Sequence, residues 1–143
     1  SYFEHSLQLR KETLSDDNVL IAWAYFNSAS VLTKMKETEK AIHYYEEAIR
    51  RFLRINEIGI CVPAYICIAE AYLDLNDCTK ATNALEQAFT YEYEYYGEEN
   101  CRKYWLYDIK SKILEKQGKN DEAAEYRRWS EEEYKKYIQS RET

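Results

Sequence analysis

The sequence contains an internal repeat of about forty residues. Three 29-residue segments, beginning at Ala24, Ala64 and Leu106, align without gaps. Each has a small residue at the same place in its first half and again in its second half: Ala29, Ala69 and Ser111, then Ala48, Ala88 and Ser130. Small residues at fixed positions let two helices approach closely. One helical hairpin cannot bury its apolar faces alone, but stacked hairpins form a continuous core.

Turn-forming residues fall between the segments of apolar periodicity. Gly59, Gly97 and Gly118 are the only glycines, and Pro63 is the only proline. Between these breaks apolar residues recur every three or four positions, as they do on one face of a helix. The pattern predicts an all-α superhelix, a solenoid of antiparallel hairpins joined by short turns. We expect seven helices, at residues 2–14, 18–35, 38–54, 60–75, 79–96, 100–117 and 120–138.

The aligned positions resemble the tetratricopeptide repeat (TPR), whose pattern combines aromatic, small and apolar residues in two helices. The first copy matches at Tyr25, Ala29, Leu32, Ala41, Tyr45 and Ala48, and the second at Tyr65, Ile68, Ala69, Tyr72, Ala81, Leu85 and Ala88. The third matches at Tyr107, Ser111, Leu114, Gly118 and Ala123. It departs from the pattern at Arg127 and Ser130, as a capping repeat does. The repeats are longer than the usual ~34 residues, and their long second helices are similar to the kinesin light chain subtype.

The repeat alignment also divides the chain. The stretch KETLSDDN, residues 11–18, is a faint copy of the stretch that ends in YYGEEN, residues 95–100. We therefore expect residues 1–17 to be the second helix of a truncated repeat in a piece of a longer array. Residues 18–57 and 58–99 are then complete repeats, and 100–143 is a third repeat with a degenerate capping helix.

The tyrosine-rich run YEYEYYGEEN, residues 91–100, permits three interpretations. Its strict alternation resembles a half-buried strand, whereas its tyrosine spacing also suits a helix, and the acidic flanks could invite tyrosine modification. The run continues the stripe of Ala81, Leu85 and Ala88, which favours a helix ending near Gly97. On that interpretation Glu92 and Glu94 face water.

Charge and cysteine usage restrict the partners and the compartment. The formal net charge is −6 and the pI is about 5.1, which argue against nucleic acid or an anionic membrane as the main partner. The four cysteines form no CxxC pair, and Cys61 and Cys67 have apolar neighbours. We expect reduced, buried thiols and a cytoplasmic protein, with a disulfide or redox role as the alternative.

The sequence offers no catalytic motif. It has no phosphate-binding glycine loop, zinc-protease motif or nucleophile elbow, and only two histidines, His5 and His43. Glu39, His43 and two further glutamates, Glu46 and Glu47, have helical spacing that could suit a metal, but it equally describes a solvated helix face. We prefer the solvated face, and we predict a protein that is not an enzyme, with no cofactor and no metal.

The resemblance instead implies a peptide-binding groove lined by the first helix of each repeat. On this register the groove residues are Trp23, Phe26, Asn27, Ser30, Lys34, Ile66, Glu70, Asp74, Trp105, Asp108 and Lys112. Trp23 and Trp105 could instead pack between repeats. The clamp with which some family members grip a C-terminal carboxylate is missing, because Phe26, Ser30, Cys67 and Ile109 stand at its positions.

Two functions remain open from the sequence. We expect a protein–protein interaction module that binds a peptide segment of a partner in the groove. The alternative is an intramolecular regulatory or oligomerisation scaffold that packs on another domain of its parent protein or self-associates through the exposed N-terminal helix.

Overall fold

The computed structural model describes residues 18–97 and 103–142, and within these ranges it is helical without any strand. The helices are α2 (Val19–Lys34), α3 (Thr38–Arg54), α4 (Cys61–Asp74), α5 (Cys78–Tyr96), α6 (Lys103–Lys116) and α7 (Asn120–Glu142). A short 3₁₀ helix, η1 (Ile58–Ile60), precedes α4. The predicted all-α class is confirmed. The expected helix 2–14 lies outside the described residues, and α7 continues past the predicted end at residue 138.

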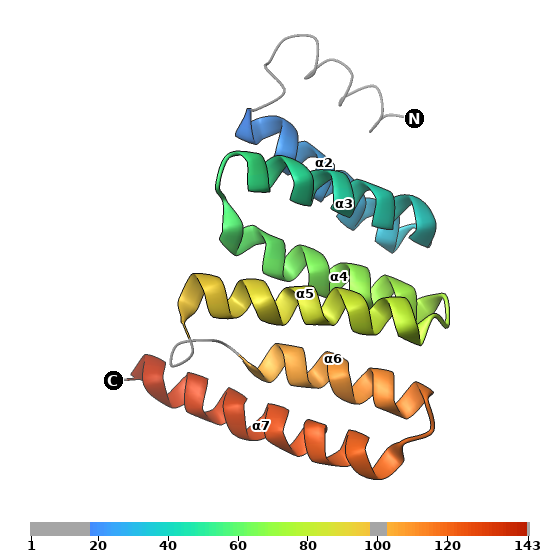
Figure 1. The fold of residues 1–143 in the computed structure, drawn as a ribbon, viewed down its shortest axis with the longest axis vertical. Coiled ribbons are helices and arrows are strands. Elements are labelled where there is room, and N and C mark those ends of the chain that lie inside the picture. Colours follow the sequence, from blue (N-terminus) through green and yellow to red (C-terminus); the bar gives the residue numbers. More distant parts are fainter. Residues whose placement is uncertain (1–17, 98–102, 143) are drawn as a thin grey trace.

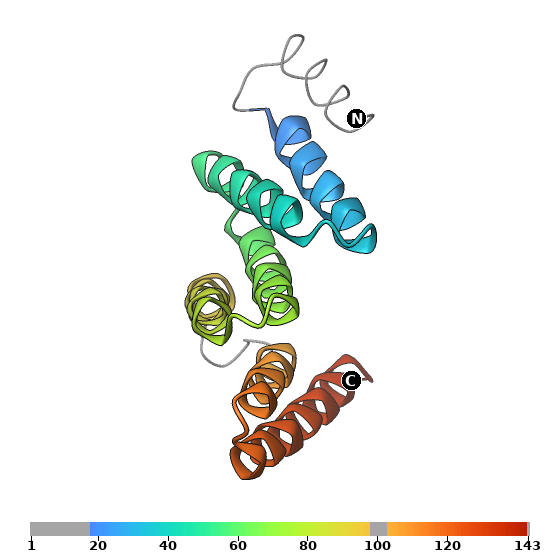
Figure 2. The same ribbon diagram turned by 90° about the vertical axis from the view of Figure 1, so that its right-hand side faces the viewer.

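Consecutive helices pair into antiparallel hairpins, α2 with α3, α4 with α5 and α6 with α7. The hairpins stack one after another along the long axis of the molecule (Figures 1 and 2). Contacts between hairpins run from α3 to α4 and from α5 to α6, and α4 also touches α6. This is the solenoid architecture that the repeat predicts.

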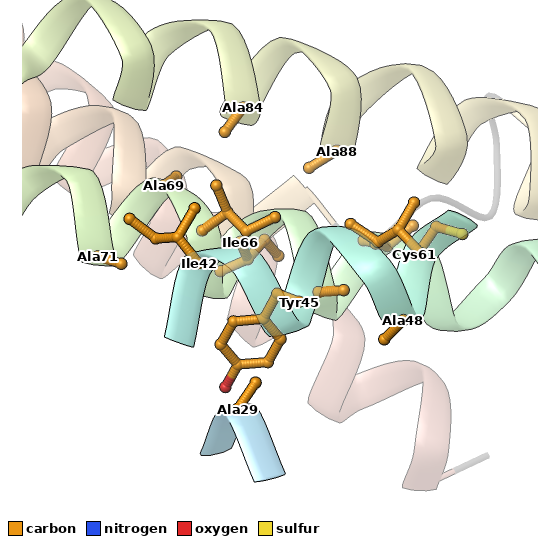
Figure 3. Close-up of a cluster of buried hydrophobic side chains, with 14 of the residues drawn as sticks. Ala29, Ile42, Tyr45, Ala48, Cys61, Ile66, Ala69, Ala71, Ala84 and Ala88 are labelled. Carbon is orange, nitrogen blue, oxygen red and sulfur yellow. The ribbon is translucent and has the colours of Figure 1, made fainter. Parts of the chain in front are cut away.

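Small residues occupy the helix crossings, as the repeat alignment requires. Ala29, Ala48, Ala69 and Ala88 are completely buried, and Figure 3 shows these side chains within the core. Their Cβ atoms leave room for larger neighbours, so the crossing helices pack at short range. The register of the repeat is thereby confirmed in the first two complete hairpins.

The third hairpin keeps the register with serines. Ser111 on α6 is 1% exposed, and its hydroxyl donates to the Asp108 carbonyl at 2.7 Å. Ser130 on α7 is half-buried, and its hydroxyl donates to the Tyr104 carbonyl at 2.6 Å. Each hydroxyl is hydrogen-bonded to a backbone carbonyl, which offsets the desolvation cost of placing a polar group at a helix crossing.

The turns within the hairpins use one backbone conformation at equivalent positions. Lys36, Asn76 and Gly118 have φ angles of 63°, 60° and 78°, in the left-handed region. Asn and Gly adopt this region at low cost, whereas the Cβ of lysine is strained there. Two helices, α2 and α5, begin with a side-chain cap: Asn18 accepts from the Leu20 amide at 2.7 Å, and Asp77 accepts from the Lys80 amide at 3.1 Å.

The tyrosine-rich run is helical as far as Tyr96, and Gly97 ends α5 with φ 77°. The helical interpretation is confirmed for residues 91–96, while Glu98, Glu99 and Asn100 lie outside the described residues. The expectation that Glu92 faces water is wrong, because its side chain is only 2% exposed. Glu92 follows Ala88 by four residues on the buried stripe of α5, so helical periodicity turns it inward.

Candidate functional site

Some predicted groove residues of α2 pack against other side chains, and others are exposed to solvent. Trp23 is 39% exposed, and its ring makes edge contacts with Phe26 at 5.6 Å and with Phe52 of α3 at 5.1 Å. The indole therefore packs within its own hairpin and keeps an open edge. Asn27 and Lys34 are exposed and Ser30 is half-buried.

Tyr45 joins α2 to α4 beneath these positions. Its ring packs against Phe26 at 5.5 Å, and its hydroxyl interacts with Thr33 and Ser30 of α2 and with Cys67 of α4. Burial, followed by the nearby Cys67, raises the pKa of Tyr45 to about 12. The phenol stays neutral at physiological pH and fixes the spacing of two first helices.

On α4 the predicted groove residues behave differently from one another. Glu70 and Asp74 are exposed. Ile66 is completely buried and lies in the core cluster of Figure 3, so its prediction as a groove residue is wrong. Its turn of the helix faces the neighbouring helices, and a partner cannot reach its side chain in this structure.

On α6 the groove positions combine an aromatic residue with an ion pair. Trp105 is 37% exposed. Asp108 and Lys112 are one helical turn apart, and the Lys112 ammonium lies 3.2 Å from the Asp108 carboxylate. Ile109 is 1% exposed and belongs to the core.

A cleft of about 270 Å³ lies between these faces of α4 and α6 and is called the α4–α6 cleft below. Its lining residues are Glu70, Leu73, Asp74, Lys112, Glu115 and Lys116. The structure thus brings together three residues that the sequence predicts for the groove, Glu70, Asp74 and Lys112. Trp23 and the other positions on α2 do not line this cleft.

The carboxylate of Glu70 is set by the charges around the α4–α6 cleft. The Glu70 side chain is exposed overall, but the groups that flank the cleft withdraw its carboxylate partly from water, and this partial burial raises its pKa. Lys112 opposes that rise, and the carboxylates of Asp108 and Asp74 add to it. Four charged side chains from two hairpins therefore act on one another across the cleft.

Some charges of the cleft are already engaged. Lys116 donates to the Asn76 side chain at 2.9 Å, and Glu115 forms an ion pair with Arg127 of α7. Within the described residues, Glu70 and Asp74 form no ion pair or hydrogen bond through their side chains. These two carboxylates are the groups open to a partner.

A larger cleft of about 580 Å³ lies between the second helices α3 and α5, over α4, and is called the α3–α5 cleft below. None of the residues that the sequence predicts for a groove lines it. Its lining residues are Glu46, Ile49, Arg50, Leu53, Tyr65, Ile68, Tyr72, Lys80, Asn83, Ala84 and Gln87. At 3.6 residues per turn, Tyr65 and Ile68 lie on roughly the opposite face of α4 from Glu70 and Asp74. The α3–α5 cleft and the α4–α6 cleft are therefore separate from each other.

The other chemical candidates stay apart. Among the described residues no group of three or more His, Cys, Asp and Glu side chains could hold a metal ion. His43 is exposed and its ring packs on Tyr44 at 6.2 Å. Cys61, Cys67 and Cys78 are free thiols, and burial raises the pKa of Cys61 to about 11. Such a thiol is a poor nucleophile at neutral pH.

Across residues 18–97 and 103–142, no helix combines the length and the apolar character needed to cross a bilayer.

Comparison with known proteins points to the same family as the repeat pattern. The tetratricopeptide repeat family model matches residues 1–54, a segment that includes α2 and α3. No curated protein matches the chain. Tetratricopeptide repeats are typically non-catalytic modules that mediate protein–protein interactions. The match over residues 1–54 and the stack of helical hairpins in the described residues support a tetratricopeptide repeat domain.

Proposed function

We propose that this protein binds a peptide segment of a partner protein in the concave groove formed by its first helices α2, α4 and α6. The observation that carries the proposal is the α4–α6 cleft, in which Glu70 and Asp74 of one hairpin face Lys112 of the next. A cleft built by two repeats suits a ligand that runs along the stack.

The electrostatics of the cleft favour a ligand with a basic side chain. Lys112 forms its ion pair with Asp108, whereas Glu70 and Asp74 form no ion pair among the described residues. Burial raises the pKa of Glu70, and an arriving lysine or arginine would restore the charged form. Peptide binding would then lower that pKa.

Two exposed indoles supply the apolar part of the interaction. Trp23 and Trp105 keep 39% and 37% of their surface exposed. Aromatic side chains of this kind are frequent among the residues that contribute most to binding energy. We assign them as anchor residues at α2 and α6, with the charged cleft fixing the register of the peptide between them.

A displayed library of random peptides, selected on the immobilised protein, tests the proposal. The selected peptide is measured by calorimetry against wild type, Trp23→Ala and Lys112→Glu. We expect Trp23→Ala to weaken binding about tenfold, because such an aromatic contact is worth roughly 1 to 2 kcal/mol. Lys112→Glu should instead strengthen the binding of a peptide with lysine or arginine, because it replaces a like charge beside Glu70 and Asp74 with a further carboxylate. Lys135→Glu on α7, also an exposed lysine, is the matched control and should bind like wild type.

The result is interpretable only if the helical circular dichroism of each variant equals that of wild type. Peptides that bind Trp23→Ala and Lys112→Glu with unchanged affinity would show that the concave groove is not the binding site. Selected sequences without an excess of lysine and arginine would contradict the role given to Glu70 and Asp74.

The scaffold function has its own observation. Helix α7 exposes Tyr134 and Ile138 one turn apart on the same face, with 49% and 37% of their surfaces open. Such a face suits packing on another domain or on a second copy. Sedimentation over a hundredfold range of concentration separates these cases, and Tyr134→Glu should abolish any dimer formed through this face. The predicted self-association through residues 1–17 lies outside the described residues.

A further inference from the structure

The α3–α5 cleft has a counterpart one hairpin further along, which the chain fills with its own aromatic side chains. The counterpart lies between α5 and α7, over α6. There the ring of Tyr107 lies 6.1 Å from Phe89, 5.7 Å from Tyr126 and 6.1 Å from Trp129, and Tyr126 contacts Trp129 at 4.9 Å. Four rings from three helices close this position of the stack.

The corresponding positions of the α3–α5 cleft carry smaller side chains. The repeat alignment on Ala81 and Ala123 places Ala84 where the next hairpin has Tyr126, and Gln87 where it has Trp129. The aromatic floor is kept, because Tyr65 corresponds to Tyr107. The cleft of about 580 Å³ is thus the space that two aromatic side chains fill in the next repeat.

The walls of the cleft suit the same kind of occupant. Ile49, Leu53 and Ile68 provide aliphatic surface, and the Tyr65 ring stacks on Tyr91 at 5.7 Å with an interplanar angle of 8°. This stack holds the floor in place. A cleft of this volume, mainly apolar with a few polar groups, is typical of a specific binding site.

The charged side chains at the mouth of the α3–α5 cleft determine which charge a ligand should carry. Arg50 donates to Glu47 at 3.2 Å, and Lys80 lies 4.0 Å from the carboxylate of Asp77. Both cations therefore have acidic partners. Glu46 lines the same cleft and has no ion pair or hydrogen bond through its side chain within the described part of the chain. The charge left to be complemented is negative.

We propose that the α3–α5 cleft is a second binding site, for a partner peptide that presents a tryptophan or tyrosine beside a lysine or arginine. The ring enters between Ala84 and Ile49 and lies over Tyr65, as Tyr126 lies against Tyr107 in the next hairpin. The basic side chain pairs with Glu46. This site is formed by the second helices α3 and α5 and by the face of α4 that points away from the α4–α6 cleft, so it does not depend on the function proposed above.

Two small probes with the same ring and opposite charge test the proposal. Tryptamine carries an indole and an ammonium group, and indole-3-propionate carries an indole and a carboxylate. Each is titrated into the ¹⁵N-labelled protein, and amide shifts are followed by NMR. We expect saturable shifts in α3, α4 and α5 around the cleft, with tryptamine binding roughly two- to fivefold tighter, the size expected of an exposed ion pair. Glu46→Gln should remove this difference.

A variant that copies the next repeat provides the second arm. Gln87→Trp places an indole where α7 has Trp129, and we expect it to abolish the tryptamine shifts while the helical circular dichroism is unchanged. Gln139→Trp, at an exposed position of α7, is the matched control and should leave the shifts intact. Lys112→Glu, in the concave groove, should also leave them intact.

Three outcomes would contradict different parts of the proposal. Tryptamine shifts that map to the concave groove, or that survive Gln87→Trp, would overturn the site. Equal affinities of the two probes in wild type would overturn the assignment of a basic neighbour. A concentration-dependent dimer that Gln87→Trp abolishes would show that the occupant is a second copy of the chain instead of a partner peptide.

Discussion

The ring of Tyr95, near the end of α5, lies directly against the backbone of Gly59 in η1. A Cβ atom added at residue 59 would stand 3.1 Å from Cζ and 3.2 Å from Cε1 of Tyr95. Tyr95 is 55% exposed, so its ring can withdraw by a few tenths of an ångström. We expect Gly59→Ala to destabilise the protein by on the order of 0.5 to 1 kcal/mol in urea denaturation, at the low end for overpacking.

The same contact predicts a change of sign in a double-mutant cycle. In the Tyr95→Ala background nothing opposes the new methyl group, and alanine reduces the entropy of the unfolded chain. Gly59→Ala should then stabilise by about 0.5 kcal/mol. If Gly59→Ala has the same effect in both backgrounds, the Tyr95 ring does not rest on residue 59 in solution.

Lys36 provides a site for stabilisation. It holds a φ of 63°, which is strained for a residue with a Cβ atom, whereas the equivalent turns use Asn76 and Gly118. We expect Lys36→Gly to raise the free energy of unfolding by roughly 0.5 to 1 kcal/mol, since the relief of strain exceeds the entropy cost of glycine. Asn76→Gly is the control and should change it by only a few tenths. A destabilised Lys36→Gly would show that this turn relaxes out of the left-handed region.

Ala88 and Ala124 form a matched pair for testing the helix crossings. Ala88 is completely buried on α5, and Ala124 is exposed on α7. Ala88→Glu drives a carboxylate into the core, and we expect a loss of about 3 kcal/mol or more in thermal or urea denaturation. Ala124→Glu should melt within a few degrees of wild type. Equal melts of the two variants would refute the register of the repeats.

Glu70 predicts a pH dependence of stability. Its pKa is raised in the folded protein, from an ordinary 4.5, mainly by burial. Above that ordinary value the folded state holds more protons at this site than the unfolded state, so its contribution to stability falls as pH rises. Between about pH 4 and pH 7, Glu70→Gln should remove this component of the slope. Urea denaturation at several pH values measures it.

Two further variants test the cause of the Glu70 shift, with opposite results. Lys112 lowers the pKa of Glu70 and Asp108 raises it. Lys112→Met should therefore raise that pKa further and Asp108→Asn should lower it, as followed by the ¹³C shift of the Glu70 carboxyl carbon. Shifts of the same sign in both variants would contradict the arrangement of charges around the α4–α6 cleft.

Most of the fold could be predicted because the repeat and the helical period agree. The alignment identified Ala29, Ala69 and Ala88 as crossing residues, and all three are buried. Helix boundaries from α2 to α5 fall within one residue of the prediction, since Asn, Asp or Gly marks most ends. The left-handed backbone at Lys36 could not be predicted from residue type, because lysine rarely adopts that conformation.

The sites were less predictable, because burial at one helix turn depends on the neighbour that crosses it. Ile66 was assigned to the groove by its position in the repeat, yet the crossing helices cover it completely. The charge of Glu92 favours a solvent-exposed side chain, but its position on the apolar stripe of α5 places it in the interior. The α3–α5 cleft could have been predicted from the repeat alignment. Ala84 and Gln87 align with Tyr126 and Trp129, so the side chains at these two positions are smaller in the second repeat than in the third.

The Arg51 side chain, only 6% exposed, connects the two helices of the first hairpin. Its guanidinium lies 5.0 Å from the centroid of the Tyr25 ring on α2, while its Nε donates to Glu47 on α3 at 3.1 Å. A desolvated cation–π contact of this kind contributes on the order of 1 to 2 kcal/mol. Unlike aliphatic packing, it depends on the position of the charge over the ring, so it favours one register of α2 against α3.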